Sequence, residues 1–98
     1  MERFFPEATD EEIKKEKARA RKLRATAWWR QKRARGRCHF CGAAVPPGEL
    51  TMEHVVPLVR GGKSVKANLV PACKECNSGK KYLLPFEWEE AREHPAAG

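Results

Sequence analysis

Two Cys-x-x-Cys pairs, Cys38-His39-Phe40-Cys41 and Cys73-Lys74-Glu75-Cys76, enclose the run Glu53-His54-Val55-Val56-Pro57, and this nested stretch decides the fold. All four cysteines of the chain fall in the two pairs, and the spacing is typical of zinc ligands. A redox dithiol is an alternative, but it would need a thioredoxin-like βαβ pattern, which is not visible here. Because four thiolates form a closed tetrahedral shell, we expect a structural Zn²⁺ held by Cys38, Cys41, Cys73 and Cys76.

Neither a secretory signal nor a membrane span can be drawn on the sequence. Phe4-Phe5 is flanked by charged residues, and the longest apolar runs are interrupted by Pro57 and Pro71. We therefore expect a soluble cytoplasmic protein with no membrane partner, and a virus-infected host cell is one such setting. In a cytoplasmic protein the cysteines would bind metal rather than form disulfides.

The chain has 98 residues, which allows one small domain with an extension. So short a chain buries little apolar surface, and a bound metal ion would add the stability that its core lacks. The interval from Gly42 to Ala72 exceeds the roughly 15 to 20 residues of an ordinary four-cysteine zinc ribbon. We expect this interval, which contains Glu53 and His54, to have structure of its own.

Positive charge is concentrated in one segment. The net charge is +7, and twelve of the 20 Lys and Arg residues lie between Lys14 and Arg37, where Glu16 is the only acid. This density predicts a surface that binds a polyanion, most often a nucleic acid. A merely solvated helix face would alternate Glu with Lys at i,i+4, and a membrane-surface helix would need a broader apolar face.

The chain divides into four parts. Residues 1–8 are expected to be a disordered or docking lead, residues 9–36 a long basic helix, residues 37–84 a metal-binding module, and residues 85–98 a short helix and tail. Thr9 with Glu12, or Asp10 alone, can cap the basic helix, and Gly36 can end it. At least one of the two adjacent tryptophans, Trp28 and Trp29, should dock this helix onto the module, with stacking on bases as the alternative.

Within the module, residues 50–56 read as a strand, paired with residues 57–60 or with the first cysteine pair. The loop Gly61-Gly62-Lys63-Ser64 follows. Residues 66–83 have a helical tendency interrupted by Pro71, and the second cysteine pair lies near the start of the final helix. Pro85 can begin a last short helix that reaches Glu93.

The full order of these motifs is more specific than any one of them. The two pairs, Glu53-His54-Val55-Val56-Pro57, Gly61-Gly62, Asn68-Leu69-Val70-Pro71-Ala72, Asn77 and Lys80 together resemble the HNH nuclease family, in the branch braced by a four-cysteine zinc site. The resemblance covers roughly residues 37–84, and it extends to the lead-in Trp28-Trp29-Arg30. It implies a small α+β fold built on the ββα-metal motif, also called the His-Me finger.

The same resemblance implies a catalytic site. His54 would be the general base, and Asn68 would hold the loop and help to orient His54. Glu53 and Asn77 would bind a catalytic ion, and because both offer oxygen ligands the ion should be hard, Mg²⁺ or Mn²⁺. Adjacent residues on a regular strand point to opposite faces, so Glu53 and His54 can serve one phosphate only if the strand twists, bulges or ends there.

DNA is the partner that the charge and the resemblance both imply. The residues expected to contact its phosphates are Arg24, Arg30, Lys32 and Arg33 in the basic helix and Arg60, Lys63, Lys80 and Lys81 in the module. We expect a metal-dependent DNA endonuclease that cuts or nicks with little sequence preference of its own. A dimer, or a specificity or genome-processing partner protein, would supply specificity in a phage or restriction setting. The alternative is a non-catalytic, zinc-braced DNA-binding module.

Overall fold

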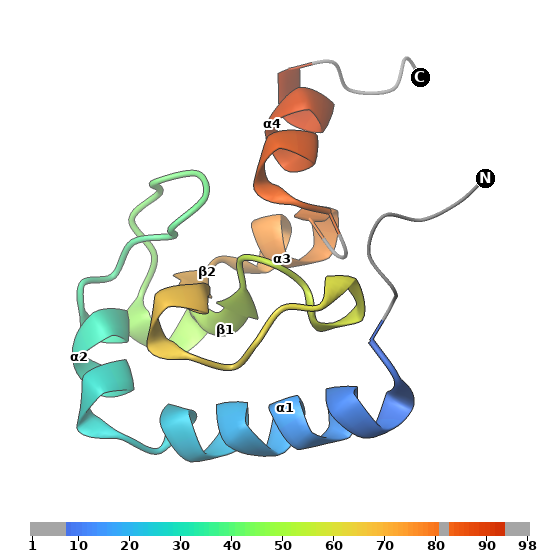
Figure 1. Cartoon of the computed structure of the whole chain (residues 1–98). Helices are drawn as coiled ribbons and strands as arrows, with labels where there is room; N and C mark the ends of the chain where they lie inside the picture. Colours follow the sequence, from blue (N-terminus) through green and yellow to red (C-terminus); the bar gives the residue numbers. More distant parts are fainter. Residues whose placement is uncertain (1–7, 81–82, 94–98) are drawn as a thin grey trace.

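A small two-stranded sheet lies between two helices in the computed structural model, which describes residues 8–80 and 83–93. The strands are β1 (Thr51–His54) and β2 (Leu69–Ala72). Helix α1 (Asp10–Arg24) runs along one face of the sheet, and α3 (Lys74–Lys80) lies on the other (Figure 1). Helix α2 (Ala27–Ala34) lies at the side, and α4 (Pro85–Glu93) stands beyond α3. The expected small α+β fold with a ββα unit is confirmed, and α4 has the bounds that the sequence predicted.

The basic segment forms two helices rather than the single helix expected over residues 9–36. Thr9 and Glu12 form a capping box at the start of α1. Thr26 then takes an extended backbone, and its hydroxyl accepts a hydrogen bond from the Trp29 N–H at 3.3 Å, which caps α2. The same hydroxyl donates to the Leu23 carbonyl at 2.6 Å, so one threonine ends α1 and begins α2. The chain therefore changes direction between α1 and α2, although no Gly or Pro lies at this point.

The sheet has a different pairing from the one expected. Strand β1 pairs antiparallel with β2, with Thr51 opposite Ala72 and His54 opposite Leu69, rather than with residues 57–60 or with the first cysteine pair. The helical tendency expected over residues 66–83 was wrong for Leu69–Ala72, where β2 lies, whereas Lys66–Asn68 forms a short 3-10 helix and α3 begins at Lys74. All four residues of β2 are buried, and burial on both faces favours a strand over the local helical tendency.

The core is small and lies on both sides of the sheet. Around the cysteines, Leu50 and Ala72 pack with Cys38 and Cys76. On α2, Trp29 is only 1 % exposed, and it confirms that a tryptophan docks the basic segment onto the module. Its neighbour Trp28 is half-buried, with lysine side chains over its ring.

Candidate metal centre and active site

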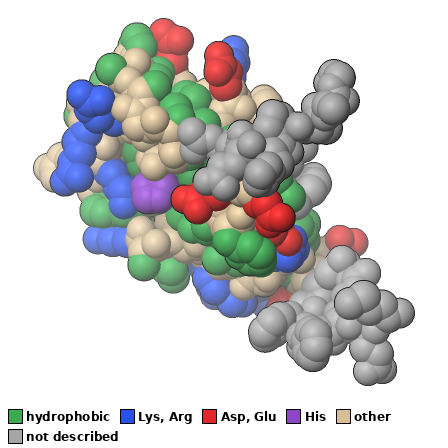
Figure 2. Space-filling model, turned by 90° about the horizontal axis from the view of Figure 1, so that it is seen from above, with side chains coloured by type: hydrophobic (Ala, Val, Ile, Leu, Met, Phe, Trp, Pro, Cys, Tyr) green, Lys and Arg blue, Asp and Glu red, His purple; other side chains and the backbone are tan. Residues whose placement is uncertain are grey.

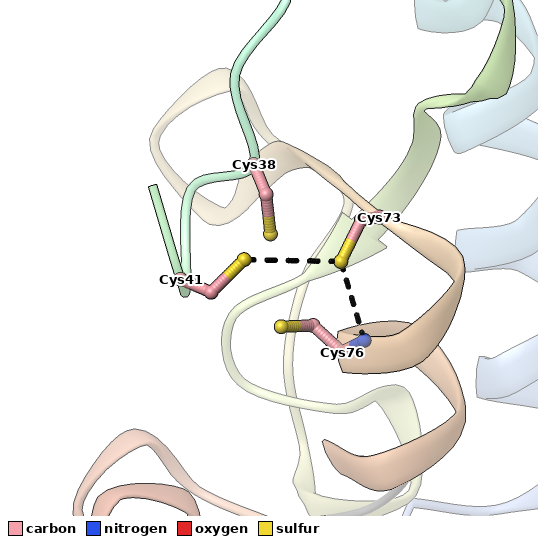
Figure 3. A group of neighbouring side chains, drawn as sticks. All are labelled: Cys38, Cys41, Cys73 and Cys76. Carbon is pink, nitrogen blue, oxygen red and sulfur yellow. Dashed lines mark hydrogen bonds between the residues drawn. The ribbon is translucent and has the colours of Figure 1, made fainter. Parts of the chain in front are cut away.

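The four cysteine side chains converge on one point (Figure 3). Their Sγ atoms all lie within 4.8 Å of one another, and those of Cys41 and Cys73 are 3.9 Å apart. A tetrahedral Zn²⁺ about 2.3 Å from each sulfur would set the sulfurs about 3.8 Å apart, so the spacing fits a four-thiolate site. All four lie in the described part of the chain, and none is in a disulfide. The cluster is thus positioned to bind a metal ion, as the spacing predicted.

Backbone geometry aims the sulfurs. In the first pair, Gly42 has a φ of +74°, and its N–H donates to the Cys38 carbonyl at 2.9 Å. The Cys38 N–H in turn donates to the Ala43 carbonyl at 3.0 Å, which closes the turn. Cys73 directly follows β2 and precedes α3, where the Cys76 N–H points at the Cys73 sulfur at 3.5 Å. Each cysteine pair therefore forms one half of the site through its own local backbone geometry.

The thiols need a cation if all four are to ionise. Burial opposes ionisation of Cys38, but backbone N–H groups near its sulfur, led by those of Cys41 and Cys73, lower its pKa to about 7. Burial raises the pKa of the Cys76 thiol, and the neighbouring sulfurs raise it further. Because several thiolates this close repel one another, an ion of positive charge is required to hold the set together.

The second site forms where β1 ends. The strand stops at His54, and a bend leads to Pro57. A surface cleft of about 220 Å³ is lined by both Glu53 and His54. Glu53 and His54 thus line one cleft at the point where the strand ends.

His54 is held by a serine from the loop that follows. Its Nε2 atom lies 2.9 Å from the Ser64 hydroxyl. Burial lowers the pKa of His54 below the ordinary 6.5. The negative charge of Glu16 opposes this shift, whereas the positive charges of Lys80 and Arg24 lower the pKa further. The ring is therefore neutral at physiological pH, the state in which an imidazole can accept a proton.

Glu53 is a half-buried carboxyl in the same cleft. Burial raises its pKa, while the N–H of His54, which donates to its Oε1 at 3.1 Å, and the charge of Lys80 act in the opposite direction. A carboxylate that pays a desolvation cost gains from a cation placed beside it. A cation bound beside Glu53 would therefore offset the cost of its burial.

Asn77 lies on α3, at the same face of β1 as Glu53. Its side-chain amide donates to the Thr51 hydroxyl at 3.2 Å, and Thr51 and Glu53 are two residues apart on the strand, so they share a face. Asn77 thus lies on the Glu53 side of β1, although it lines neither of the clefts that His54 lines.

Asn68 fixes the backbone after β1. Its Oδ1 accepts from the Val56 N–H at 2.8 Å, and its Nδ2 donates to the carbonyls of Val56 at 3.1 Å and Lys63 at 2.9 Å. This one side chain joins the bend behind His54 to the loop that carries Ser64. The contacts agree with the loop-holding function expected of Asn68.

The sequence missed two basic residues that line a cleft with His54. A cleft of about 300 Å³ between α1 and β1 is lined by Lys17, Arg21 and Arg24 together with His54. It adjoins the Glu53 cleft, since Lys17, His54 and Leu58 line both. Of these cations only Arg24 was expected at DNA. The helical spacing of Lys17, Arg21 and Arg24 was the signal that could have found the other two.

The other expected phosphate contacts have varied surroundings. Arg60 forms an ion pair with Glu87 of α4 at 3.1 Å, and Lys63 is exposed. The expectation for Lys80 is corrected, because Lys80 is fully buried and donates to the His54 carbonyl at 3.2 Å instead of facing solvent. Lys81 lies outside the described residues.

The contacts expected on α2 lie at or near the surface. Arg30 is exposed and donates to the Ala25 carbonyl at 3.1 Å. Lys32 lies over the Trp28 ring, 5.3 Å from its centroid, and Arg33 is half-buried. On the face seen in Figure 2, Lys and Arg side chains gather mainly along one edge, whereas Asp and Glu lie across the middle and near the top. That face is therefore not uniformly basic.

Two further residues at the site were not identified from the sequence. The Ser64 N–H donates to the Glu16 carboxylate, and the Ser64 hydroxyl donates to the Glu16 carbonyl, both at 2.5 Å. Glu16 is 4 % exposed although it lies on a basic helix. Its isolation among cations was the available signal, because a lone acid there has a reason to be buried.

Comparison with known families found that residues 38–89 match the HNH endonuclease family. A comparison with curated proteins found no match. The matched segment spans both cysteine pairs, the sheet, α3 and part of α4, so the chain belongs to the HNH endonuclease family. Among the described residues, no helix combines the length and apolar character that a membrane span requires.

Proposed function

We propose that this protein is a metal-dependent endonuclease that hydrolyses phosphodiester bonds in DNA. The observation that carries the proposal is the pair of adjoining clefts at the end of β1, where His54 lies beside Glu53 and beneath the cations of α1. Membership of the HNH endonuclease family supports the reaction class. The residues present supply a base, a metal ligand and groups that attract a phosphate.

His54 acts as the general base. Its neutral ring accepts a proton from the attacking water, and the low pKa that burial imposes keeps the ring neutral at physiological pH. Asn68 holds the bend that follows the strand, so His54 remains directed into the cleft instead of moving with a loose loop.

Glu53 and Asn77 hold a hard divalent cation, Mg²⁺ or Mn²⁺. The half-buried carboxyl of Glu53, whose pKa is raised by burial, supports this function because a bound cation offsets its desolvation. When bound, such an ion supplies Lewis-acid stabilisation of the charge that develops on the phosphate and the leaving oxygen. Two protein ligands bind it weakly, so the affinity rises when DNA is present.

Lys17, Arg21 and Arg24 bind the DNA backbone beside His54. They attract phosphates of any sequence, because a phosphate contact carries no direct information about the bases. The intrinsic sequence preference is therefore low. Specificity comes from a partner protein or from a second copy of the chain, as in a phage genome-processing or restriction system.

Cleavage of supercoiled plasmid DNA tests the proposal. The wild-type protein should produce nicked or linear DNA with Mg²⁺ or Mn²⁺ and none with excess chelator, and His54→Ala should lose about 10²- to 10⁴-fold in rate. His39→Ala is the matched control, because His39 is exposed in the first cysteine turn and should cut at the wild-type rate. Tight binding of DNA without cleavage in any divalent metal would instead identify a zinc-braced DNA-binding module.

A further inference from the structure

The hydrogen bonds around Ser64 have a fixed direction. A backbone carbonyl can only accept, so the 2.5 Å contact between the Ser64 hydroxyl and the Glu16 carbonyl uses the single hydroxyl proton. Toward His54 the same oxygen can then only accept. The 2.9 Å contact therefore requires a proton on Nε2 of His54.

We propose that Ser64, clamped by Glu16, holds the neutral ring of His54 in the Nε2–H tautomer and leaves Nδ1 as the atom that accepts a proton. Ser64 is a positioning residue, because it acts on the reaction only through His54. The part of this inference that makes Nδ1 the catalytic base rests on the proposed endonuclease function. The tautomer itself does not, since it follows from the donors and acceptors alone.

Several buried hydrogen bonds fix Ser64 on Glu16. Glu16 accepts from the Ser64 N–H through its carboxylate and from the Ser64 hydroxyl through its carbonyl, so both atoms of the serine are fixed. Arg19 holds the second carboxylate oxygen at 2.6 Å. Both Glu16 and Ser64 are 4 % exposed, so water competes little for these bonds. Serine is thus held in a single orientation.

The clamp also gives α1 a function in the active site. Glu16 lies outside residues 38–89, the segment that matches the family. The basic helix therefore does more than attract DNA, because its one buried acid sets the proton position on the base. Removing the Ser64 hydroxyl should allow His54 to adopt either tautomer. The Ser64 N–H would still donate to Glu16, so the loop should stay in place.

Nitrogen-15 NMR of the full-length, zinc-loaded protein tests the tautomer directly, without substrate. At about pH 8 the rings are neutral, and the protonated and unprotonated ring nitrogens differ widely in chemical shift. The chain has three histidines, so a His54→Ala spectrum identifies the His54 signals. Wild type should show Nε2 protonated, and Ser64→Ala should show a mixture of tautomers. Ser78→Ala, the only other serine and an exposed one, should match wild type.

Cleavage kinetics give the second readout. Ser64→Ala should lower kcat by about 10- to 100-fold with an unchanged KM for DNA, because an orienting hydrogen bond to the imidazole is lost while binding groups remain. A His54 ring that carries its proton on Nδ1 in wild type, or a Ser64→Ala spectrum identical to wild type, overturns the inference. A loss confined to KM also overturns it. If wild type fails to cleave DNA at all, the proposed function falls, whereas the wild-type spectrum still decides the tautomer.

Discussion

Asn68 binds both backbone groups of Val56, accepting from its N–H at 2.8 Å and donating to its carbonyl at 3.1 Å. This pairing replaces the ladder bonds that β1 would have made had it continued, so the strand can end at His54 without leaving unpaired backbone. The carbonyl of Val56 also receives a close approach from Gly62 on the following loop. The position of His54 therefore depends on the close packing of Asn68 and Gly62 around the Val56 backbone.

Gly62→Ala should therefore damage both fold and cleavage. A Cβ at Gly62 would meet the Val56 carbonyl oxygen and carbon and the Pro57 carbonyl oxygen, all backbone atoms that cannot rotate away. We expect a loss of at least about 1–3 kcal/mol in the free energy of unfolding, measured by chemical denaturation, together with slower cleavage. Gly48→Ala is the control, since a Cβ there meets nothing within 4 Å, and equal stability of the two variants would contradict the prediction.

Removal of zinc should unfold the protein. Zinc binding to four thiolates is worth about 10–16 kcal/mol in small peptides, which matches or exceeds the whole stability of about 5–15 kcal/mol of an ordinary domain. We expect one zinc per chain by elemental analysis and loss of the cooperative thermal transition after a strong chelator or in Cys73→Ser. A chelator-treated protein that still melts cooperatively at the wild-type temperature would rule out a structural zinc.

Glu53→Gln should slow cleavage strongly without loss of stability. Removing the carboxylate weakens binding of the catalytic ion, and we expect the cleavage rate to fall by about 10²- to 10³-fold. Burial raises the pKa of Glu53, so its charged form destabilises the fold above that pKa, and the neutral variant should melt at or above the wild-type temperature at pH 7 without divalent ions. The difference should vanish at low pH, where Glu53 is protonated. Exposed Glu49→Gln is the control, and a clear drop in melting temperature for Glu53→Gln alone would count against this account.

Arg24→Gln should weaken DNA binding in a salt-dependent manner. Each phosphate contact releases counterions, so losing one should reduce the slope of log affinity against log salt by about 0.9. Arg35→Gln, a change of equal charge on an exposed residue at the end of α2, should alter the slope less. Fluorescence anisotropy with a short duplex at several salt concentrations measures both. Identical slopes for the two variants would mean that the cleft beside His54 does not bind phosphate.

Glu16→Gln should show a pH-dependent loss of stability. The N–H of Ser64 lowers the pKa of Glu16 against the opposing effect of burial, with help from the charges of Arg19 and Lys63. A lowered carboxyl pKa stabilises the fold above the unfolded value, and that stabilisation disappears as the pH falls through the folded value. Wild type should therefore exceed Glu16→Gln in stability at pH 7, and the gap should narrow below the ordinary value of 4.5. A gap that stays constant across this range would contradict a charged Glu16.

The sequence predicted the parts of the site whose geometry is local. A Cys-x-x-Cys turn brings two sulfurs together by itself, so a four-cysteine metal site could be predicted from the spacing, and the four sulfurs do converge in the structure. The helix at Pro85–Glu93 was likewise predicted, because a proline marks its start. Glu53 and His54 are adjacent in the sequence, and both line one cleft where β1 ends.

The sequence by itself thus determined the four cysteine ligands and the adjacency of Glu53 and His54, because each depends on neighbours within a few positions. The order of the motifs along the chain indicated the family. Only the tertiary structure decided the pairing of β1 with β2, the burial of Lys80 and the clamp of Glu16 on Ser64. These contacts join residues far apart in the chain, and they form only where the packed core repays the entropy of closing the intervening loops. A local pattern does not record that balance. The isolation of Glu16 among cations could mark this acid as unusual, but it could not show that Glu16 reaches Ser64 beside His54.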